Sequence, residues 1–173
     1  MEEKEFPTVL IDTSLGHIKV ELWEHRAPIT VKNFLRYVQD SFYDGTIFHR
    51  VIDNFMVQGG GLTPDMRQKQ SGLHPAIKNE ADAALSNERG TIAMARTQEI
   101  DSATSQFFIN VNDNKFLDHQ NDTPKGFGYA VFGRVIEGMD DIVEKISKIK
   151  TSTIGPFSDV PAKPVMINSI KLL

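Results

Sequence analysis

The chain opens with two segments whose hydrophobic pattern is typical of β-structure. Residues 8–13 are rich in β-branched and apolar side chains. Residues 16–23 alternate apolar and polar positions, with Ile18, Val20 and Leu22 on one face. Alternation with a period of two is the pattern of a strand that is buried on one side. Because only a short turn separates the two segments, the pattern predicts a β-hairpin.

Two later segments repeat their apolar residues with the period of a helix. The first begins at Pro28, has Thr30 as a candidate N-cap, and carries a stripe formed by Val31, Phe34, Leu35 and Val38. The second lies near the other end of the chain, and its stripe consists of Met139, Ile142, Val143, Ile146 and Ile149. Spacings of three and four residues place each set on one face, so the pattern predicts two amphipathic helices.

Short apolar runs separated by turn residues predict six further strands. We expect them at residues 47–52, 55–58, 91–96, 106–111, 129–136 and 164–172. Residues 62–88 show no long period and are typical of a loop. Because helices do not alternate with strands, a parallel sheet is disfavoured. The predicted fold is mainly β: a single domain over residues 1–173, with eight strands in a closed β-barrel and two α-helices.

Composition narrows the possible functions. With 173 residues, 40% of them hydrophobic and 24% charged, the chain has the size and composition of one soluble globular domain. Its net charge is −4 and no basic block is present, which argues against nucleic-acid binding. No apolar run reaches the roughly 20 residues that cross a bilayer. The acidic residues 1–5 do not resemble a signal peptide, so we expect a cytoplasmic protein with no membrane partner.

The residues that usually hold metals or act as nucleophiles are missing or differently spaced. The chain has no cysteine, none of its five histidines is paired at i and i+4, and no His-Glu-x-x-His run occurs. A Gly-x-Ser-x-Gly elbow is also absent. The run at residues 59–61 is Gly-Gly-Gly, but no Lys-Ser/Thr pair follows it, so we interpret it as a strand-ending turn and not as a phosphate site. We expect no metal and no cofactor.

Several polar residues stand out inside the predicted strands. Arg50 interrupts an apolar run, and Gln58 closes another. In the strand over 106–111, the residues expected to face the core are Phe107, Ile109 and Val111. Gln106 and Phe108 then share the opposite face, which places a large aromatic ring beside an amide. An apolar patch with a few fixed polar groups is typical of a ligand groove. The alternative is that loops cover both faces and the polar groups bind only backbone.

Five sequence blocks resemble the signature blocks of the cyclophilin family. They lie at residues 48–52, 55–60, 94–96, 105–109 and 131–133, in the family's order and with its spacing, over residues 8–172. Several independent blocks in register are a stronger signal than any single short motif. The resemblance implies an eight-stranded antiparallel barrel capped by two helices, and peptidyl-prolyl cis–trans isomerase activity on proline-containing segments of other proteins.

The resemblance also implies roles for individual residues. Arg50 is similar to the family's catalytic arginine, and we expect Gln58 to orient it. The walls of the proline pocket correspond to Phe55, Met56, Phe108 and Leu117. Positions that contact the substrate backbone or the catalytic arginine correspond to Gln58, Ala95, Arg96 and Gln106.

Two positions depart from the pattern of many eukaryotic members. Phe116 stands where those carry tryptophan, and Tyr129 where they carry histidine, and both variants resemble the bacterial branch. We assign both to substrate binding. Phenylalanine lacks the indole N–H that can donate to the inhibitor cyclosporin, so we expect weak cyclosporin binding. The only tryptophan, Trp23, belongs to the early hairpin and is not expected to report on the groove.

Two further functions stay open at this stage. A non-catalytic proline-peptide-binding module or chaperone on the same scaffold would need the pocket but not the arginine, so an intact Arg50 favours the enzyme. A hydrolase that uses a serine and a histidine lacks any supporting motif. We expect the protein to act as a monomer.

Overall fold

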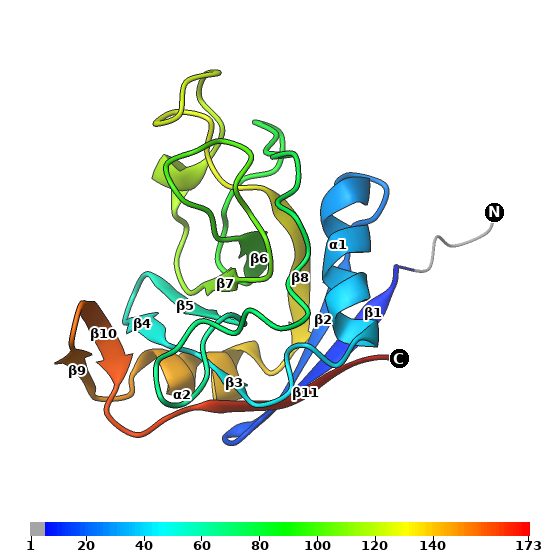
Figure 1. Ribbon diagram of the computed structural model, residues 1–173. Coiled ribbons are helices and arrows are strands. Elements are labelled where there is room, and N and C mark those ends of the chain that lie inside the picture. Colours follow the sequence, from blue (N-terminus) through cyan, green and yellow to red (C-terminus); the bar gives the residue numbers. More distant parts are fainter. Residues whose placement is uncertain (1–5) are drawn as a thin grey trace.

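The structure is a computed structural model that describes residues 6–173 (Figure 1). The acidic segment 1–5 lies outside the described residues. The strands are β1 (Thr8–Thr13), β2 (Gly16–Leu22), β3 (Thr46–Ile47), β4 (Arg50–Ile52), β5 (Met56–Gly59), β6 (Thr91–Met94), β7 (Phe107–Asn110), β8 (Val131–Glu137), β9 (Thr151–Ile154), β10 (Phe157–Pro161) and β11 (Met166–Leu172). The helical segments are α1 (Pro28–Gln39), the 3-10 turn η1 (Lys115–Leu117), the π-helical turn η2 (Met139–Val143) and α2 (Glu144–Ser147).

Nine of the strands described in residues 6–173 form one curled antiparallel sheet. Their order is β3-β11-β1-β2-β8-β6-β7-β5-β4, and β9 and β10 form a separate hairpin. The mainly β fold with two helices is therefore confirmed, but the closed eight-stranded barrel is not. The strand expected over residues 47–52 is interrupted at Phe48 and His49, so that β3 and β4 lie at opposite ends of the sheet order. Phe48 is fully buried, and its N–H donates to Val165 O outside the ladders.

The N-terminal hairpin forms as the hydrophobic pattern predicts. β1 pairs with β2 in register from Thr8 opposite Glu21 to Thr13 opposite Gly16. The Thr13 hydroxyl oxygen accepts hydrogen bonds from the N–H groups of Leu15 and Gly16, each at 3.1 Å, and these bonds close the turn. Gly16 has a φ of +140°, which favours glycine. The apolar faces of both strands are buried in the main core.

Helix α1 confirms the predicted stripe but not the predicted cap. Its buried residues include Val31, Phe34 and Val38. Thr30 lies inside the helix, after an N-cap at Ala27 and a proline at the first position. The Thr30 N–H and hydroxyl both donate to the Glu80 carboxylate, at 2.6 and 2.7 Å. A carboxylate from the long loop over 62–88 therefore caps this helix, and sequence patterns three or four residues long cannot reveal such a contact.

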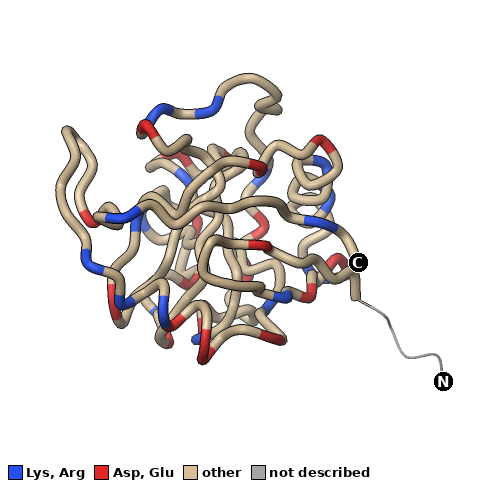
Figure 2. Tube along the Cα trace, turned by 90° about the horizontal axis from the view of Figure 1, so that it is seen from below, with Lys and Arg blue, Asp and Glu red and all other residues tan. Residues whose placement is uncertain are grey.

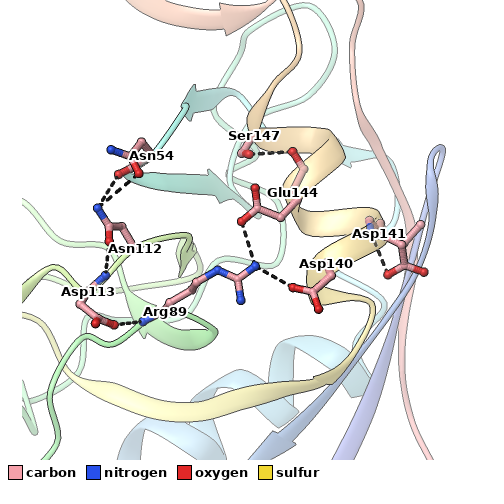
Figure 3. Close-up of polar contacts among 9 residues, drawn as sticks. Asn54, Arg89, Asn112, Asp113, Asp140, Asp141, Glu144 and Ser147 are labelled. Carbon is pink, nitrogen blue, oxygen red and sulfur yellow. Dashed lines mark hydrogen bonds and ion pairs between the residues drawn. The ribbon is translucent and has the colours of Figure 1, made fainter.

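The second predicted helix is shorter than its stripe suggests. It consists of η2 followed by one turn of α2, and Val143 and Ile146 are its fully buried apolar residues. Arg89, which precedes β6, donates to Asp140 at 2.8 Å and to Glu144 at 2.9 Å, so it links this helix to the sheet (Figure 3). These hydrogen bonds raise the pKa of the Arg89 guanidinium above its ordinary value.

The hairpin of β9 and β10 was not predicted from the sequence. β9 is mostly exposed, with 44% of the Ile154 surface accessible, whereas β10 is buried only at its end, at Val160 and Pro161. Because burial does not alternate along either strand, they carry no apolar alternation that could be recognised. A turn at Gly155, with a φ of +55°, joins them. The loop over 62–88 contains no helix or named strand, in agreement with the sequence pattern.

Acidic and basic residues are scattered along the whole trace (Figure 2). None of the helices described in residues 6–173 is long and apolar enough to cross a membrane. Both ends of the described chain lie side by side, because the Leu173 N–H donates to Thr8 O at 2.8 Å. The buried apolar residues divide into a large core, which α1 covers on one side, and a small cluster on the other face of β5–β7.

Candidate active site

The alternation of residues in β7 places its side chains on two sides of the sheet. Phe107 and Ile109 are fully buried in the large core, together with Val111 just after the strand. Phe108 belongs instead to the small cluster, whose other buried members are Met56, Ala93, Leu117 and Val131. The predicted facing of Phe107 and Phe108 is therefore confirmed, and the small cluster forms the floor of a depression in the surface.

This depression is a cavity of about 130 Å³. Nine of the eleven residues predicted for the site line it, namely Arg50, Phe55, Met56, Gln58, Ala95, Arg96, Phe108, Leu117 and Tyr129. The antiparallel pairs of β4, β5 and β7 bring them together, because Arg50 lies opposite Gln58 and Gln58 lies opposite Phe108. Tyr129 meets the edge of the Phe108 ring, with 5.6 Å between ring centroids.

The two remaining predicted residues lie beside the cavity. Gln106 accepts a hydrogen bond from the Gln58 side-chain amide, at 3.0 Å. Gly61 allows this approach, since a Cβ at that position would collide with the Gln106 side chain. Phe116, with 66% of its surface accessible, packs against Phe55 at 5.6 Å between ring centroids and forms an exposed rim.

Arg50 is exposed at the mouth of the cavity. Among the described residues, its guanidinium forms no hydrogen bond and no ion pair. Gln58 was expected to orient the guanidinium, but its amide donates to Gln106. The guanidinium of Arg50 is therefore free to donate to a ligand, whereas the paired amides of Gln58 and Gln106 form a fixed polar edge next to it.

The neighbouring histidine points into the protein. His49 is 6% exposed, and its Nδ1 atom has no hydrogen-bond partner among the described residues. Burial, with a smaller contribution from the charge of Arg50, lowers the pKa of His49 to about 4. The ring is neutral at physiological pH, so the positive charge at the cavity belongs to the arginines.

Arg96 connects the cavity to two surface loops. Its guanidinium donates to the carbonyl oxygens of Gly128, Thr97 and Pro124 at 2.8 to 2.9 Å. It also lies 5.0 Å from the centre of the Tyr129 ring, a cation–π distance. Arg96 was predicted to contact the substrate or the catalytic arginine. Its side-chain hydrogen bonds hold the walls of the cavity in place, and its contact with a substrate stays a prediction.

Comparison with known proteins assigns the family. The family model of the cyclophilin type peptidyl-prolyl cis-trans isomerases matches this sequence over residues 8–172. The chain belongs to this family. "Peptidyl-prolyl cis-trans isomerase cyp18" of Streptomyces antibioticus is 58% identical, over 96% of this chain and 98% of the relative. "Peptidyl-prolyl cis-trans isomerase B" of Escherichia coli is 50% identical, over 94% and 97%. A crystal structure of a Cryptosporidium parvum family member superposes with a TM-score of 0.79 at 26% identity and covers 98% of both chains.

A network of buried asparagines supports the cavity of this cyclophilin, and the sequence did not predict it. Asn114, just before η1, donates to Phe55 O and to Asn110 Oδ1, both at 2.9 Å. Asn110 is fully buried at the end of β7 and donates in turn to Asn87 and Thr91. In the sequence, Asn110 at the end of an otherwise apolar strand was the signal that could have indicated this network. The network fixes Phe55 and η1, which carry two walls of the pocket.

Two further features of the cyclophilin site concern its surroundings. Trp23 directly follows β2 and packs against the small cluster that contains Phe108, but it does not line the cavity; that it does not report on the groove stays a prediction. Within residues 6–173, no group of three or more His, Cys, Asp or Glu side chains could hold a metal ion. The polar groups at the cavity are guanidinium and amide groups, which suit a peptide better than a cation.

Proposed function

We propose that the protein is a peptidyl-prolyl cis–trans isomerase in which the cavity holds the proline ring and Arg50 stabilises the twisted peptide bond. The observation that carries this proposal is a free guanidinium at the mouth of a small cavity with an apolar floor. The volume of about 130 Å³ corresponds to about four water molecules, enough for one small ring. A C. parvum relative, 26% identical with a TM-score of 0.77, has been crystallised in the presence of the dipeptide Ala-Pro.

The reaction needs stabilisation of a twisted amide and no bond cleavage. Rotation about a peptide bond faces a barrier of about 18–20 kcal/mol because the nitrogen lone pair is delocalised into the carbonyl. Uncatalysed X–Pro exchange takes tens to hundreds of seconds. In the twisted state this delocalisation is lost, and the prolyl nitrogen becomes pyramidal and accepts a hydrogen bond. A guanidinium that donates to it stabilises the transition state more than the planar ground state.

The remaining residues hold the substrate while the bond rotates. Phe55, Met56, Phe108 and Leu117 supply the apolar surface that fixes the ring. The paired amides of Gln58 and Gln106 offer hydrogen bonds to the peptide on the side of Arg50. A charge-assisted hydrogen bond supplies about 1.5–3 kcal/mol, and positioning of the peptide supplies the rest. No step requires a metal or a cofactor.

The substrates we propose are exposed X–Pro segments of proteins during folding. We also propose that the protein acts as a cytoplasmic monomer and that Phe116 makes cyclosporin binding weak. The second candidate, a proline-binding module or chaperone without catalysis, would use the same apolar cavity. The free guanidinium favours the enzyme, because binding of a proline ring does not require it.

The replacement Arg50→Ala tests this function. We expect kcat/KM for an X–Pro peptide to fall about ten- to hundredfold, since about 1.5–3 kcal/mol of transition-state stabilisation is lost. The free energy of unfolding should change by less than about 0.5 kcal/mol because Arg50 is exposed. Arg67→Ala is the matched control, as its side chain is 85% exposed and lies outside the cavity lining. Equal isomerase rates in folded Arg50→Ala and wild type would refute the role of Arg50, and binding without turnover in the wild type would support the chaperone.

A further inference from the structure

A second cavity adjoins the proline pocket. Its volume is about 580 Å³, and its lining residues are Arg96, Thr97, Gln98, Pro124, Lys125 and Tyr129. Arg96 and Tyr129 line both cavities, so they share a wall. An extended peptide advances about 3.3–3.6 Å per residue. A peptide with its proline in the first cavity therefore brings side chains within about three positions of that proline to the second.

The loop that forms the outer wall of the second cavity is held in place. This loop, residues 118–128, appears in yellow at the top of Figure 1. Gln120 N–H donates to Gly126 O, and Phe127 N–H donates to Thr123 O, both at 2.8 Å. Arg96 fastens the loop to the pocket through Pro124 O, also at 2.8 Å. Lys125 therefore lies on a backbone whose position relative to the proline pocket is fixed.

The charged residues that line the second cavity are all positive. Arg96 and Lys125 are cationic, and none of the six lining residues is acidic. Lys125 is exposed and forms no hydrogen bond or ion pair within residues 6–173, whereas the guanidinium of Arg96 is already bound to carbonyl oxygens. The acidic residue of the same loop, Asp122, lies 3.4 Å from His119 and outside the lining. Lys125 is thus the lining cation free to pair with a ligand.

We propose that the second cavity is a substrate subsite that accepts an Asp or Glu side chain within about three residues of the isomerised proline, with Lys125 as the specificity-determining residue. This inference rests on the proposed isomerase function and narrows its substrates to X–Pro segments with a nearby carboxylate. Exposed ion pairs are weak, so the preference for Glu over its neutral isostere Gln amounts to about two- to fivefold in kcat/KM.

The test uses a set of Ala-Pro peptides with Glu or Gln at each of the three positions before and after the Ala-Pro pair. NMR exchange spectroscopy gives kcat/KM without a coupling protease, and calorimetry gives Kd without turnover. We expect one or more positions at which the wild type prefers Glu, and expect added salt to reduce the preference. Lys125→Gln should bring the Glu/Gln ratio at that position to one, and Lys125→Glu should bring it below one. Lys163→Gln, a change at an exposed lysine outside the cavity lining, should keep the wild-type ratio.

Two results would overturn the subsite. One is a Glu/Gln ratio of one at all six positions in the wild type, in both kcat/KM and Kd. The other is a preference that persists in Lys125→Gln. The Gln peptides separate this failure from failure of the proposed function. If the wild type isomerises them but shows no Glu preference, only the subsite is refuted, and if it isomerises none of the peptides, both proposals fail.

Discussion

Truncation of two adjacent phenylalanines separates the core from the pocket. Phe107 is fully buried, and its ring packs at its edges against three aromatic rings, those of Phe34, Tyr43 and Phe48. Phe108 is 4% exposed and lines the cavity of about 130 Å³. Replacement of either by alanine removes the same atoms from the same strand. The two variants therefore differ mainly in what surrounds the space that is left.

The structure sets the expected magnitudes. Buried Phe→Ala changes cost about 3–5 kcal/mol. Phe107→Ala should lie near the upper value, about 5 kcal/mol, because it leaves a closed void and loses aromatic contacts worth about 0.5–1.5 kcal/mol each. Phe108→Ala should lie near the lower value, about 3 kcal/mol, since its space joins a cavity that water can enter. At about 2–4 °C per kcal/mol, Tm falls by about 10–20 °C and 6–12 °C respectively.

Activity should fall more in Phe108→Ala than in a variant of Phe107, the reverse of the order expected for stability. Loss of a buried phenylalanine contact worth about 1.5–3 kcal/mol lowers kcat/KM of Phe108→Ala roughly ten- to hundredfold. Phe107→Leu, which keeps more of the core volume if Phe107→Ala does not fold, should retain kcat/KM within a few-fold. Thermal melts and isomerase assays on the same samples decide the matter. A larger loss of stability in Phe108→Ala than in Phe107→Ala, or equal kcat/KM in Phe108→Ala and Phe107→Leu, would refute the reasoning that Phe108 serves the substrate and Phe107 the core.

Four further predictions concern the pH dependence of the rate, the pH dependence of stability, the rim and the asparagine network. The isomerase rate should be flat between about pH 6 and 8, because His49 is already neutral and arginine stays protonated; a titration near pH 7 in the rate profile would contradict this. Because burial lowers the pKa of His49 from 6.5 to about 4, the unfolded chain binds a proton before the folded one, so the free energy of unfolding should fall by about 3 kcal/mol between pH 6.5 and 4, and urea unfolding of His49→Phe should show a weaker pH dependence. Phe116→Trp should bind cyclosporin about ten- to hundredfold more tightly in calorimetry with similar turnover, since it adds a donor for a carbonyl, and unchanged affinity would argue against this role of the rim. Asn114→Ala leaves the buried Asn110 Oδ1 without a donor and Phe55 O with the Val111 N–H alone, and should raise KM, whereas Asn112→Ala, at an exposed amide that contacts Asn54 (Figure 3), should not; equal KM in both would refute the supporting role.

Local periodicity determined the elements with a buried face. The β1–β2 hairpin, the stripe of α1 and the opposite facing of Phe107 and Phe108 all follow from spacings of two, three or four residues. Such spacings are fixed by backbone geometry, so they can be read without knowledge of the partner surface. The β9–β10 hairpin was not predicted, because β9 is mostly exposed and β10 is buried only at its end, so neither strand shows alternating burial.

Sequence resemblance identified the residues of the site but not their contacts. Nine of the eleven predicted residues line one cavity, yet Gln58 binds Gln106 where contact with Arg50 was expected, and the hydrogen bonds of Arg96 go to loop carbonyls. A hydrogen-bond partner depends on distance in space. Gln58 and Gln106 are 48 positions apart, so the pair forms only once β5 and β7 have aligned.

Tertiary structure alone decided where the strand predicted over 47–52 is interrupted and which contacts support the pocket. The apolar run over 47–52 has the pattern of one strand, but the packing of Phe48 and the hydrogen bond from its N–H to Val165 O divide it between the two ends of the sheet. Glu80 caps α1 from 50 positions away, and Asn114 reaches Phe55 across 59. A sequence determines which face of an element is apolar, because that depends on neighbouring residues. Which polar groups meet depends on how distant segments pack, because a buried donor or acceptor bonds with whatever partner the fold brings to it.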